Sequence, residues 1–400
     1  MAVGMGPGNG DPPRLRVLAF SRCYPPGFRG GGPVRSLVNL VQALGTQVDF
    51  RIITLDRDLA SDPPYPSVRH GSWQVLHGAE VLYLSRRAAT VRRLSREVAR
   101  ISPQVIYLNS FFDPIFTLKV LAARKLGLVP TVPTLLAPQG ELSTGALGLK
   151  AAKKSAFLQL ARVSGLYRDI TWQASNELEK EEIVQIVKTV RRDEVRVASD
   201  LTEEVSPEVR APIERRVPGP LRLCFLSRIS PKKNLDFALR VLAGVKVPVE
   251  FAIFGPIEDV AYWAECERLL VRLPSNIRAV YKGEVPPDQV KRTLARHDLF
   301  FFPTRGENFG HVIFESLAAG VPVLISDQTP WSDVETHEVG WSLPLSSMSA
   351  FGMAIEALSA RLPADHDVYA ERSMAYASAR VDRAGAIARA YSLFRDLVPQ

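Results

Sequence analysis

The feature that most constrains this chain is a regular alternation of short apolar, β-branched runs with stretches of helical periodicity. The alternation occurs twice, over residues 15–199 and again from residue 221. Such a pattern is typical of parallel sheets whose strands are joined by crossover helices. At 400 residues the chain is long enough for two such units with separate cores. We therefore predict an α/β fold of two doubly wound, Rossmann-like domains that face each other across a cleft.

Composition marks the boundaries of these domains. A proline-rich, charged stretch after residue 204 indicates a linker. We expect an N-terminal domain at 14–204, a linker at 205–220, a C-terminal domain at 221–380 and a final helix at 381–400. Residues 1–13 are rich in Gly and Pro and lack an apolar segment, so we expect a disordered lead-in there and no secretory signal.

The expected elements follow from the same alternation. Asn176 followed by Glu179 predicts a capping box at the start of the helix from residue 177. The expected strands are 15–21, 48–55, 81–85, 105–109, 131–137, 170–174, 195–199, 221–227, 249–254, 277–281, 299–302, 322–326 and 341–344, and the residues after 347 are expected to be helical only.

The clearest candidate site is the segment 305–323, which contains two glutamates. Glu307 follows the apolar run 299–302, and Glu315 lies within a short helix that ends before the strand 321–326. A carboxylate on the loop can accept hydrogen bonds from sugar hydroxyls, and one inside the helix can accept those of a ribose. The alternative is a βαβ turn with two surface glutamates.

The backbone between these glutamates predicts a phosphate site. Asn308, Phe309, Gly310 and His311 lie where the short helix begins, and the first N–H groups of a helix lack partners within it. Helix ends of this kind bind phosphate well. We therefore predict that these four residues and Glu315 bind a nucleotide-sugar donor.

A second candidate is the basic turn after the strand that starts at residue 221. Arg228 and Lys233 follow this strand, and a helix begins near Asn234. A guanidinium and an ammonium at one edge of a sheet would neutralise a diphosphate leaving group. Lys232 is the adjacent alternative, and a basic surface turn with no ligand is the other interpretation.

A glycine-rich loop, residues 25–33, connects the first strand with the helix from residue 34. Gly31 and Gly32 lack side chains, so their amides can approach a ligand closely. The glycine spacing is not that of a dinucleotide fingerprint. A donor-binding loop and a flexible connector are both compatible with it.

The segments 305–326 and 225–234 together resemble the signature of retaining, family-four glycosyltransferases, in a version similar to a bacterial polysaccharide-building branch. The resemblance is strong from about residue 221 to 345 and weaker before. It implies the GT-B fold, with the last helix crossing back to the N-terminal domain. It also implies Glu307, Arg228 and Lys233 as catalytic residues and a Gly31–Gly32 loop that closes over the donor pyrophosphate.

The resemblance extends to two other groups of residues. It implies that Gly255, Gly283 and Val285, at the ends of two C-terminal strands, hold the nucleotide base partly through backbone groups. Many relatives also carry a catalytic histidine in the N-terminal domain near residues 137–142, where this chain has none. We expect that the segment Gln139–Gly140–Glu141 contacts the sugar or the acceptor, and a capped turn is the alternative.

A metal is not expected. Asp56-Arg57-Asp58 has the form of a DxD motif but lacks supporting residues nearby, and Arg228 and Lys233 supply the positive charge that a metal would otherwise give. The cysteines are isolated, which fits a reducing cytosol. We therefore expect no cofactor or metal requirement.

The uneven distribution of charged residues indicates which partners this protein could bind. Residues 1–200 hold 27 Lys and Arg against 17 Asp and Glu, a balance of +10, whereas residues 201–400 hold 23 against 25, a balance of −2. The dense stretches are 86–100 and 150–154. They indicate attraction to an anionic membrane surface or to a polyprenyl-diphosphate-linked saccharide acceptor, or else a solvated helix face. No nucleic-acid-binding motif accompanies them.

We therefore expect a cytoplasmic, metal-independent, retaining glycosyltransferase, peripheral on the inner face of the membrane. It would move a sugar from a nucleotide-sugar donor to a lipid-linked saccharide in bacterial polysaccharide synthesis. The rival interpretations are a nucleotide-sugar epimerase of the same fold and a non-catalytic binding protein with a basic surface.

Overall fold

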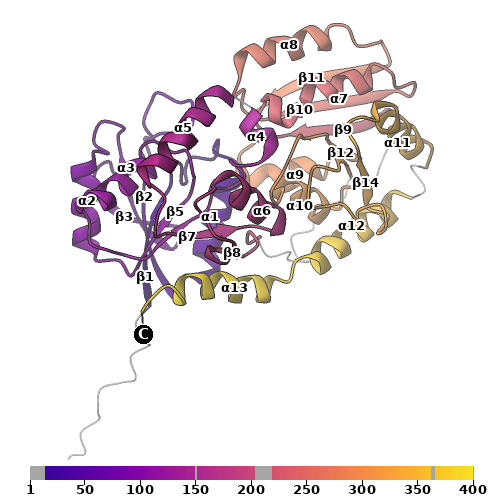
Figure 1. Ribbon diagram of the computed structural model, residues 1–400. Helices are drawn as coiled ribbons and strands as arrows, with labels where there is room; N and C mark the ends of the chain where they lie inside the picture. The colour runs from indigo at the N-terminus through magenta and orange to yellow at the C-terminus, as the bar shows by residue number, and fades with distance from the viewer. Residues whose placement is uncertain (1–13, 149–150, 203–218, 362–364, 400) are drawn as a thin grey trace, which may run out of the picture.

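The computed structural model describes residues 14–148, 151–202, 219–361 and 365–399. Two sheets organise these residues, one of eight strands and one of six. Figure 1 shows the two α/β bodies side by side, joined at the lower edge by the last helices. The expected lead-in at 1–13 and most of the expected linker at 205–220 lie outside the described residues.

The N-terminal body contains residues 14–202. Its elements are β1 (Leu15–Phe20), α1 (Gly32–Leu44), β2 (Val48–Leu55), β3 (Trp73–Leu76), β4 (Ala79–Leu84), α2 (Val91–Ile101), β5 (Val105–Leu108), α3 (Leu118–Lys125), β6 (Thr134–Leu136), α4 (Thr144–Gly148), α5 (Ala151–Ser164), β7 (Thr171–Ala174), α6 (Glu177–Ile186), η1 (Arg192–Glu194) and β8 (Val195–Val197).

The C-terminal body and the tail follow. Their elements are β9 (Leu221–Leu226), η3 (Pro231–Lys233), α7 (Leu235–Leu242), β10 (Val249–Phe254), α8 (Val260–Leu270), β11 (Ile277–Gly283), η4 (Pro287–Gln289), α9 (Val290–Leu294), β12 (Leu299–Phe302), α10 (His311–Ala318), β13 (Val323–Ser326), β14 (Gly340–Leu343), α11 (Met348–Arg361), α12 (His366–Arg380) and α13 (Arg383–Arg395).

The order of the strands in each sheet indicates where a ligand would bind. The N-terminal sheet runs β3-β4-β2-β1-β5-β6-β7-β8 and the C-terminal sheet β11-β10-β9-β12-β13-β14. The strand pairs are parallel, except that β3 pairs antiparallel with β4. In such sheets ligands bind beyond the carboxyl ends of the strands, where the strand order reverses. The loops after β1, β9 and β12 occupy these positions.

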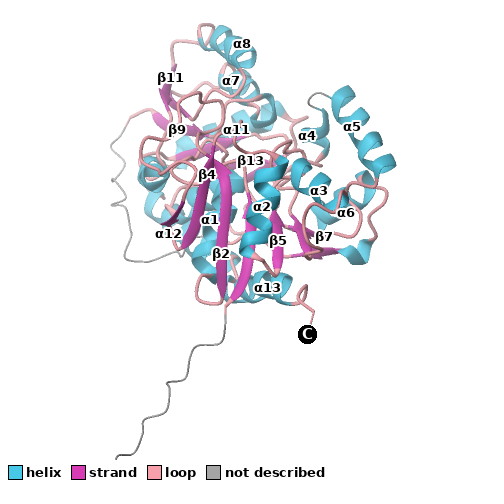
Figure 2. Ribbon diagram, turned by 90° about the vertical axis from the view of Figure 1, so that its left-hand side faces the viewer, coloured by secondary structure: helices cyan, strands magenta, loops and turns pink. Residues whose placement is uncertain are grey.

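The core lies on both faces of the N-terminal sheet. Apolar residues of α2, α3 and α6 cover one face, and those of α1 cover the other. Figure 2 shows α2 in front of the strands and α13 beneath them. One further cluster of buried residues fills the C-terminal body.

At its C-terminal end the chain returns from the C-terminal body to the N-terminal body. Helix α13 packs on the same face of the N-terminal sheet as α1, and its buried Ala390 and Phe394 join that core. The Phe394 ring lies 5.9 Å from that of Phe50 and 5.6 Å from that of Tyr107. Burial of these apolar groups therefore ties the end of the chain to the first domain.

Two sequence-based expectations need correction. The antiparallel strand β3 was not predicted, because its residues Trp73–Leu76 form a short, partly exposed edge without a regular apolar pattern. The capping box is only half formed. Asn176 accepts from the N–H of Glu179, but Glu179 accepts from Ser175 N and from Gly140 N instead of returning to Asn176. Tertiary packing has redirected the Glu179 carboxylate toward the 139–141 loop.

Candidate active site between the two domains

The loops after β9 and β12 meet through a buried ion pair. Lys233 Nζ lies 2.5 Å from Glu307 Oε1, which also accepts a hydrogen bond of 3.0 Å from Thr304 Oγ1. The side chains of Lys233 and Glu307 are only 11% and 14% exposed. Burial raises the pKa of Glu307, but Lys233 and Lys232 outweigh it and bring the pKa below its ordinary value. The pair is therefore ionic.

Arg228 lies near this pair. Its Nη1 donates to Glu258 at 2.8 Å, and its charge is close enough to help lower the pKa of Lys233, after the larger effect of burial. A Cβ built on Gly31 would lie 3.4 Å from Arg228 Nε. The basic turn of the C-terminal domain thus faces the glycine-rich loop of the N-terminal domain.

Helix α10 begins at the boundary between the two domains. Gly310 precedes it in the left-handed region, at φ 80°, and no side chain caps the helix. Trp331 Nε1 donates to the carbonyl of Phe309 at 2.5 Å, which fixes the loop before the helix. Glu307 lies close to this helix start, since its charge acts on the pKa of His311 against the larger effects of burial and Arg35. Helix starts of this kind bind anions.

His311, the first residue of α10, contacts the N-terminal domain. Its Nε2 lies 2.9 Å from Ser36 Oγ of α1 and 3.8 Å from Asp200 Oδ2. Burial and the nearby Arg35 lower the pKa of His311 to about 3, whereas burial and Glu179 raise the pKa of Asp200 to about 7. At neutral pH the imidazole is thus uncharged and hydrogen-bonded across the domain boundary.

The glycine-rich loop is held by Asp58. The Asp58 carboxylate accepts from the backbone N–H of Phe28 at 2.9 Å and of Arg29 at 3.2 Å. Because β1 and β2 are neighbours, the loop after one lies beside the residues that follow the other. Asp58 is therefore a positioning residue for the loop, a role that the sequence did not reveal. Its partner in the DxD pattern, Asp56, pairs with Arg57 at 2.8 Å.

The two turns expected to hold the base are joined. The N–H of Gly255 donates to the carbonyl of Gly283 at 2.8 Å, and Tyr281 Oη donates to the carbonyl of Gly255 at 2.8 Å. At Gly255 φ is 130°, and a Cβ there would lie 1.9 Å from the Ser227 carbonyl, so only glycine fits. Val285 is partly buried against the core beside this turn.

In the 139–141 loop, the Glu141 carboxylate is buried in hydrogen bonds to its own domain. Glu141 accepts from Ser110 Oγ and from the amides of Phe111 and Phe112, so its carboxylate organises the turn after β5. Burial raises the pKa of Glu141, although these three donors oppose it. Gln139 adopts a left-handed backbone at φ 57°.

Gly140 lies directly against the other domain. A Cβ there would be 2.5 Å from Asn308 Oδ1, and Asn176 Nδ2 donates to the Asn308 carbonyl at 2.7 Å. The structure therefore brings Gly140 of the N-terminal domain and Asn308 of the C-terminal domain into contact.

Two further ion pairs join the two domains. Arg29 of the glycine-rich loop pairs with Glu284 at 2.7 Å, next to the expected base turn. Arg35 of α1 pairs with Glu315 of α10. Neither arginine was predicted. The sequence held little evidence for them, because an arginine near a glycine-rich loop becomes informative only when its partner in the other domain is known.

Comparison with known families agrees with this geometry. Residues 210–369 match the family model described as Glycosyl transferases group 1. The match covers 160 of the 400 residues and lies within the C-terminal domain and the tail. The matched region contains Arg228, Lys233, Glu307 and Glu315, so the similarity to this family covers the C-terminal side of the candidate site.

Similarity to curated relatives is local. The chain is 28% identical over 119 residues to a sulfoquinovosyl transferase of Arabidopsis thaliana, a match that covers 30% of this chain and 22% of the plant protein. The chain thus matches about a fifth of that relative's length.

Similarity to solved structures extends over both domains. HepE of Anabaena, solved in complex with UDP-glucose, is 15% identical, with a TM-score of 0.69 over 96% of this chain and 100% of that one. Sucrose-phosphate synthase of Thermosynechococcus elongatus is 14% identical, with a TM-score of 0.70 over 96% and 99%. At such identities the likeness shows the fold, which is GT-B, as the sequence predicted.

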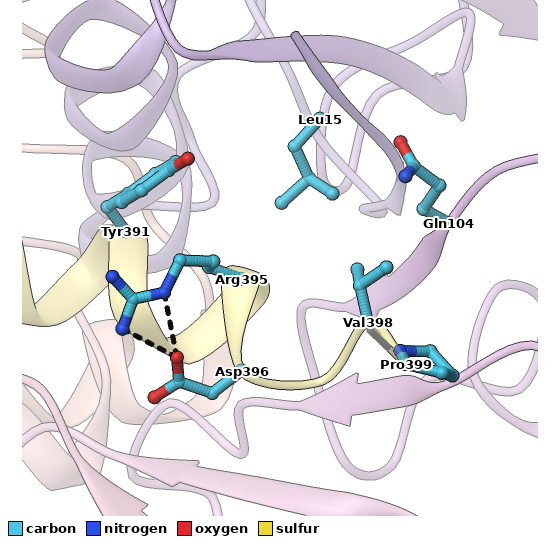
Figure 3. Close-up of a pocket in the computed structure, with 7 residues that line it drawn as sticks. All are labelled: Leu15, Gln104, Tyr391, Arg395, Asp396, Val398 and Pro399. Atoms are coloured by element: carbon cyan, nitrogen blue, oxygen red, sulfur yellow. Dashed lines mark hydrogen bonds and ion pairs between the residues drawn. The ribbon is translucent and has the colours of Figure 1, made fainter. Parts of the chain in front are cut away.

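Another pocket lies at the opposite edge of the N-terminal sheet. Figure 3 shows it between α13 and the start of β1, with the Arg395–Asp396 pair on its wall. Leu15, the first residue of β1, lines it, so it lies at the amino ends of the strands. Substrate sites of this fold class lie at the carboxyl ends, and we do not assign this pocket to the reaction.

Proposed function

We propose that this protein is a retaining, metal-independent glycosyltransferase that moves a sugar from a nucleotide-sugar donor to a saccharide acceptor. The proposal rests chiefly on the Lys233–Glu307 pair, buried beside Arg228 and the uncapped start of α10. These groups offer positive charge and backbone donors for a diphosphate next to a carboxylate for sugar hydroxyls.

Each group has a distinct part in the proposed reaction. Arg228, Lys233 and the amides near Gly310 stabilise the negative charge of the leaving diphosphate. Glu307 orients the sugar hydroxyls, and Glu315 accepts from the ribose hydroxyls. The base lies at the joined turns Gly255 and Gly283.

Retention follows from the resemblance to family four. There the acceptor attacks on the face from which the diphosphate leaves, so no enzyme nucleophile is required. Among the described residues no group of three or more His, Cys, Asp or Glu side chains is arranged to hold a metal ion. Arg228 and Lys233 would take the place of a metal opposite the diphosphate.

The donor and acceptor are proposed by class. HepE, which shares this fold, was solved with UDP and with UDP-glucose, so UDP-sugars are the first donors to test. We propose a polyprenyl-diphosphate-linked saccharide of bacterial polysaccharide synthesis as acceptor, bound by the basic N-terminal domain at the inner face of the cytoplasmic membrane. In the part of the chain that is described, no helix has the length and apolar character of a membrane span.

Donor hydrolysis without acceptor tests the proposal. Purified protein should release nucleoside diphosphate from one class among UDP-, GDP- and dTDP-sugars, and NMR should show that the sugar keeps its anomeric configuration. Conversion of the donor to an epimer without release of diphosphate would support the epimerase instead. Failure to bind any of these donors would favour the non-catalytic binding protein.

A further inference from the structure

Asn176, the residue before α6, reaches across the domain boundary. Its Nδ2 donates to the carbonyl of Asn308 at 2.7 Å, although 132 positions separate the two residues. Asn308 directly follows Glu307, the carboxylate that we assign to the transferred sugar. A side chain of the N-terminal domain therefore holds the backbone next to a proposed catalytic group of the C-terminal domain.

The loop that carries Glu307 depends on such contacts for its shape. It lies between Gly306, at φ 153°, and Gly310, at φ 80°, and both values fall in the region that favours glycine. Local sterics therefore leave several conformations open to the backbone around these two glycines. Hydrogen bonds from outside the loop select one of them.

Three successive residues of this loop are held by hydrogen bonds. The N–H of Glu307 donates to the carbonyl of Gln328 at 3.0 Å, and Trp331 Nε1 donates to the carbonyl of Phe309 at 2.5 Å. Both contacts lie within the C-terminal domain. The middle residue of the three receives the hydrogen bond from Asn176, so the N-terminal domain contributes to the conformation of the loop.

The cap of α6 fixes the orientation of the Asn176 amide. Its Oδ1 accepts from the N–H of Glu179 at 2.9 Å, as expected of the residue before a helix. Because Oδ1 is turned to the helix, Nδ2 is turned to the other domain. The same side chain thus caps α6 and presents a donor to the Glu307 loop.

The neighbouring 139–141 turn is held by the same helix start. Glu179 accepts from the N–H of Gly140 at 2.8 Å, and from the N–H and Oγ of Ser175 at 2.8 Å each. A Cβ on Gly140 would lie 2.5 Å from Asn308 Oδ1, so this turn packs against the Asn308 side chain. The start of α6 therefore governs both the donor to the Asn308 carbonyl and the surface beneath its side chain.

We propose that Asn176 is a positioning residue for glycosyl transfer. It holds the Asn308 carbonyl, and through it the backbone that aims the Glu307 carboxylate at the sugar, so that Glu307 is correctly placed when the two domains are in contact. This inference rests on the proposed function. It couples the catalytic carboxylate to the domain that is proposed to bind the acceptor.

Substitution by serine separates the two roles of Asn176. Serine is a good helix cap, so Asn176→Ser keeps an acceptor for the N–H of Glu179 but loses the donor to Asn308. Turnover in donor hydrolysis should fall about five- to tenfold, the loss expected of one hydrogen bond. The affinity for the nucleoside diphosphate and the unfolding temperature should stay close to those of the wild type, since the groups proposed to bind phosphate and base are unchanged.

Two further variants control for the helix cap. Asn176→Ala removes both the cap and the donor, whereas Thr90→Ala removes the cap of α2, where Thr90 Oγ1 accepts from the N–H of Arg93. Both should lower the unfolding temperature, but turnover well below that temperature should fall in Asn176→Ala and not in Thr90→Ala. If Asn176→Ser does not fold, Asn176→Asp, which also keeps a capping oxygen, takes its place.

A double-mutant cycle with Glu307→Gln tests whether the effect passes through Glu307. If it does, adding Asn176→Ser to Glu307→Gln should lower turnover by less than about twofold, because residues that act through one group are not additive. A general structural disturbance would lower turnover by the same factor in both backgrounds.

The outcomes are separable. Reduced turnover of Asn176→Ser at unchanged nucleotide affinity, with little further loss in the double variant, supports the positioning role. Normal turnover of Asn176→Ser, or equal losses in both backgrounds, overturns it while the proposed function stands. A wild-type protein that releases no diphosphate from UDP-, GDP- or dTDP-sugars overturns both.

Discussion

Lys233 Nζ lies 2.5 Å from Glu307 Oε1, although 74 positions separate the two residues in the chain. The pair forms because β9 and β12 are neighbours in the C-terminal sheet, so the loops that follow them end at the same edge. Each residue keeps the other charged in a buried position. Four of the predictions below concern this pair and the domain boundary beside it.

Glu307→Gln should lower turnover by about ten- to a hundredfold while nucleotide affinity stays close to that of the wild type. The amide keeps the shape but loses a charged hydrogen bond, worth roughly 1.5–3 kcal/mol. Steady-state kinetics and calorimetry with the nucleoside diphosphate measure the two effects. Glu267→Gln, an exposed carboxylate on α8, is the control. Near-normal turnover of Glu307→Gln would refute its role.

Lys233→Ala should weaken nucleoside diphosphate binding by about tenfold, and Lys232→Ala should have little effect. Lys233 is buried against Glu307, whereas the Lys232 carbonyl accepts from the N–H of Arg305, a contact that the substitution keeps. Loss of Lys233 should also lower the free energy of unfolding by about 3–5 kcal/mol, because Glu307 is left as a buried unpaired charge. Equal effects of both changes would mean that the phosphate contact is misassigned.

Activity should persist in EDTA. Arg228 and Lys233 are proposed to take the place of a metal at the diphosphate, so transfer rates with and without chelator should agree. Loss of activity that Mn²⁺ restores would contradict this expectation and direct attention to Asp56 and Asp58.

The pH dependence of stability should change when Asp200 is replaced. Its folded pKa of about 7 lies above the ordinary 3.8, so its contribution to stability is lost as the pH rises from about 4 to 7. His311 acts in the opposite sense. Its folded pKa of about 3 lies below 6.5, so its contribution is lost as the pH falls from about 6.5 to 3. In the wild type the two slopes oppose each other.

Asp200→Asn should therefore show a steeper rise in unfolding free energy between about pH 4 and 6.5 than the wild type, by at most about 1.4 kcal/mol per pH unit. His311→Gln should show a fall over the same range. Denaturant unfolding at a series of pH values checks both. If the unfolding free energies of the wild type and both variants change in parallel with pH, these groups do not titrate as their burial implies.

The basic N-terminal domain should bind anionic vesicles, and salt should weaken the binding. The structure shows which arginines of α2 are available to a membrane surface. Arg93 and Arg100 pair with the buried Glu97, whereas Arg92 and Arg96 are exposed. Arg92→Glu with Arg96→Glu should reduce vesicle flotation without disturbing the Glu97 contacts.

The matched control reverses the charges of two exposed arginines of the other domain, Arg268 in α8 and Arg272 in the turn after it. Equal flotation of the two double variants, or no flotation of the wild type at low salt, would assign the exposed arginines to an ordinary solvated face.

Much of this protein could be predicted from local sequence. Apolar β-branched runs determine the strands, and the expected ranges 48–55, 249–254 and 299–302 are those observed. The glutamate motif and the basic turn also identified a family whose fold the structure shares. These signals are readable because hydrophobic periodicity and short motifs involve residues close together in the chain.

The tertiary structure alone decided which charges meet. Arg29 reaches Glu284, Arg35 reaches Glu315, and Asp58 holds the glycine-rich loop. Glu179 leaves its expected capping partner for Gly140. Each of these contacts depends on the order of strands in a sheet or on the placement of one domain against the other. Such arrangements join residues that are far apart in the chain, and local sequence patterns do not predict these contacts.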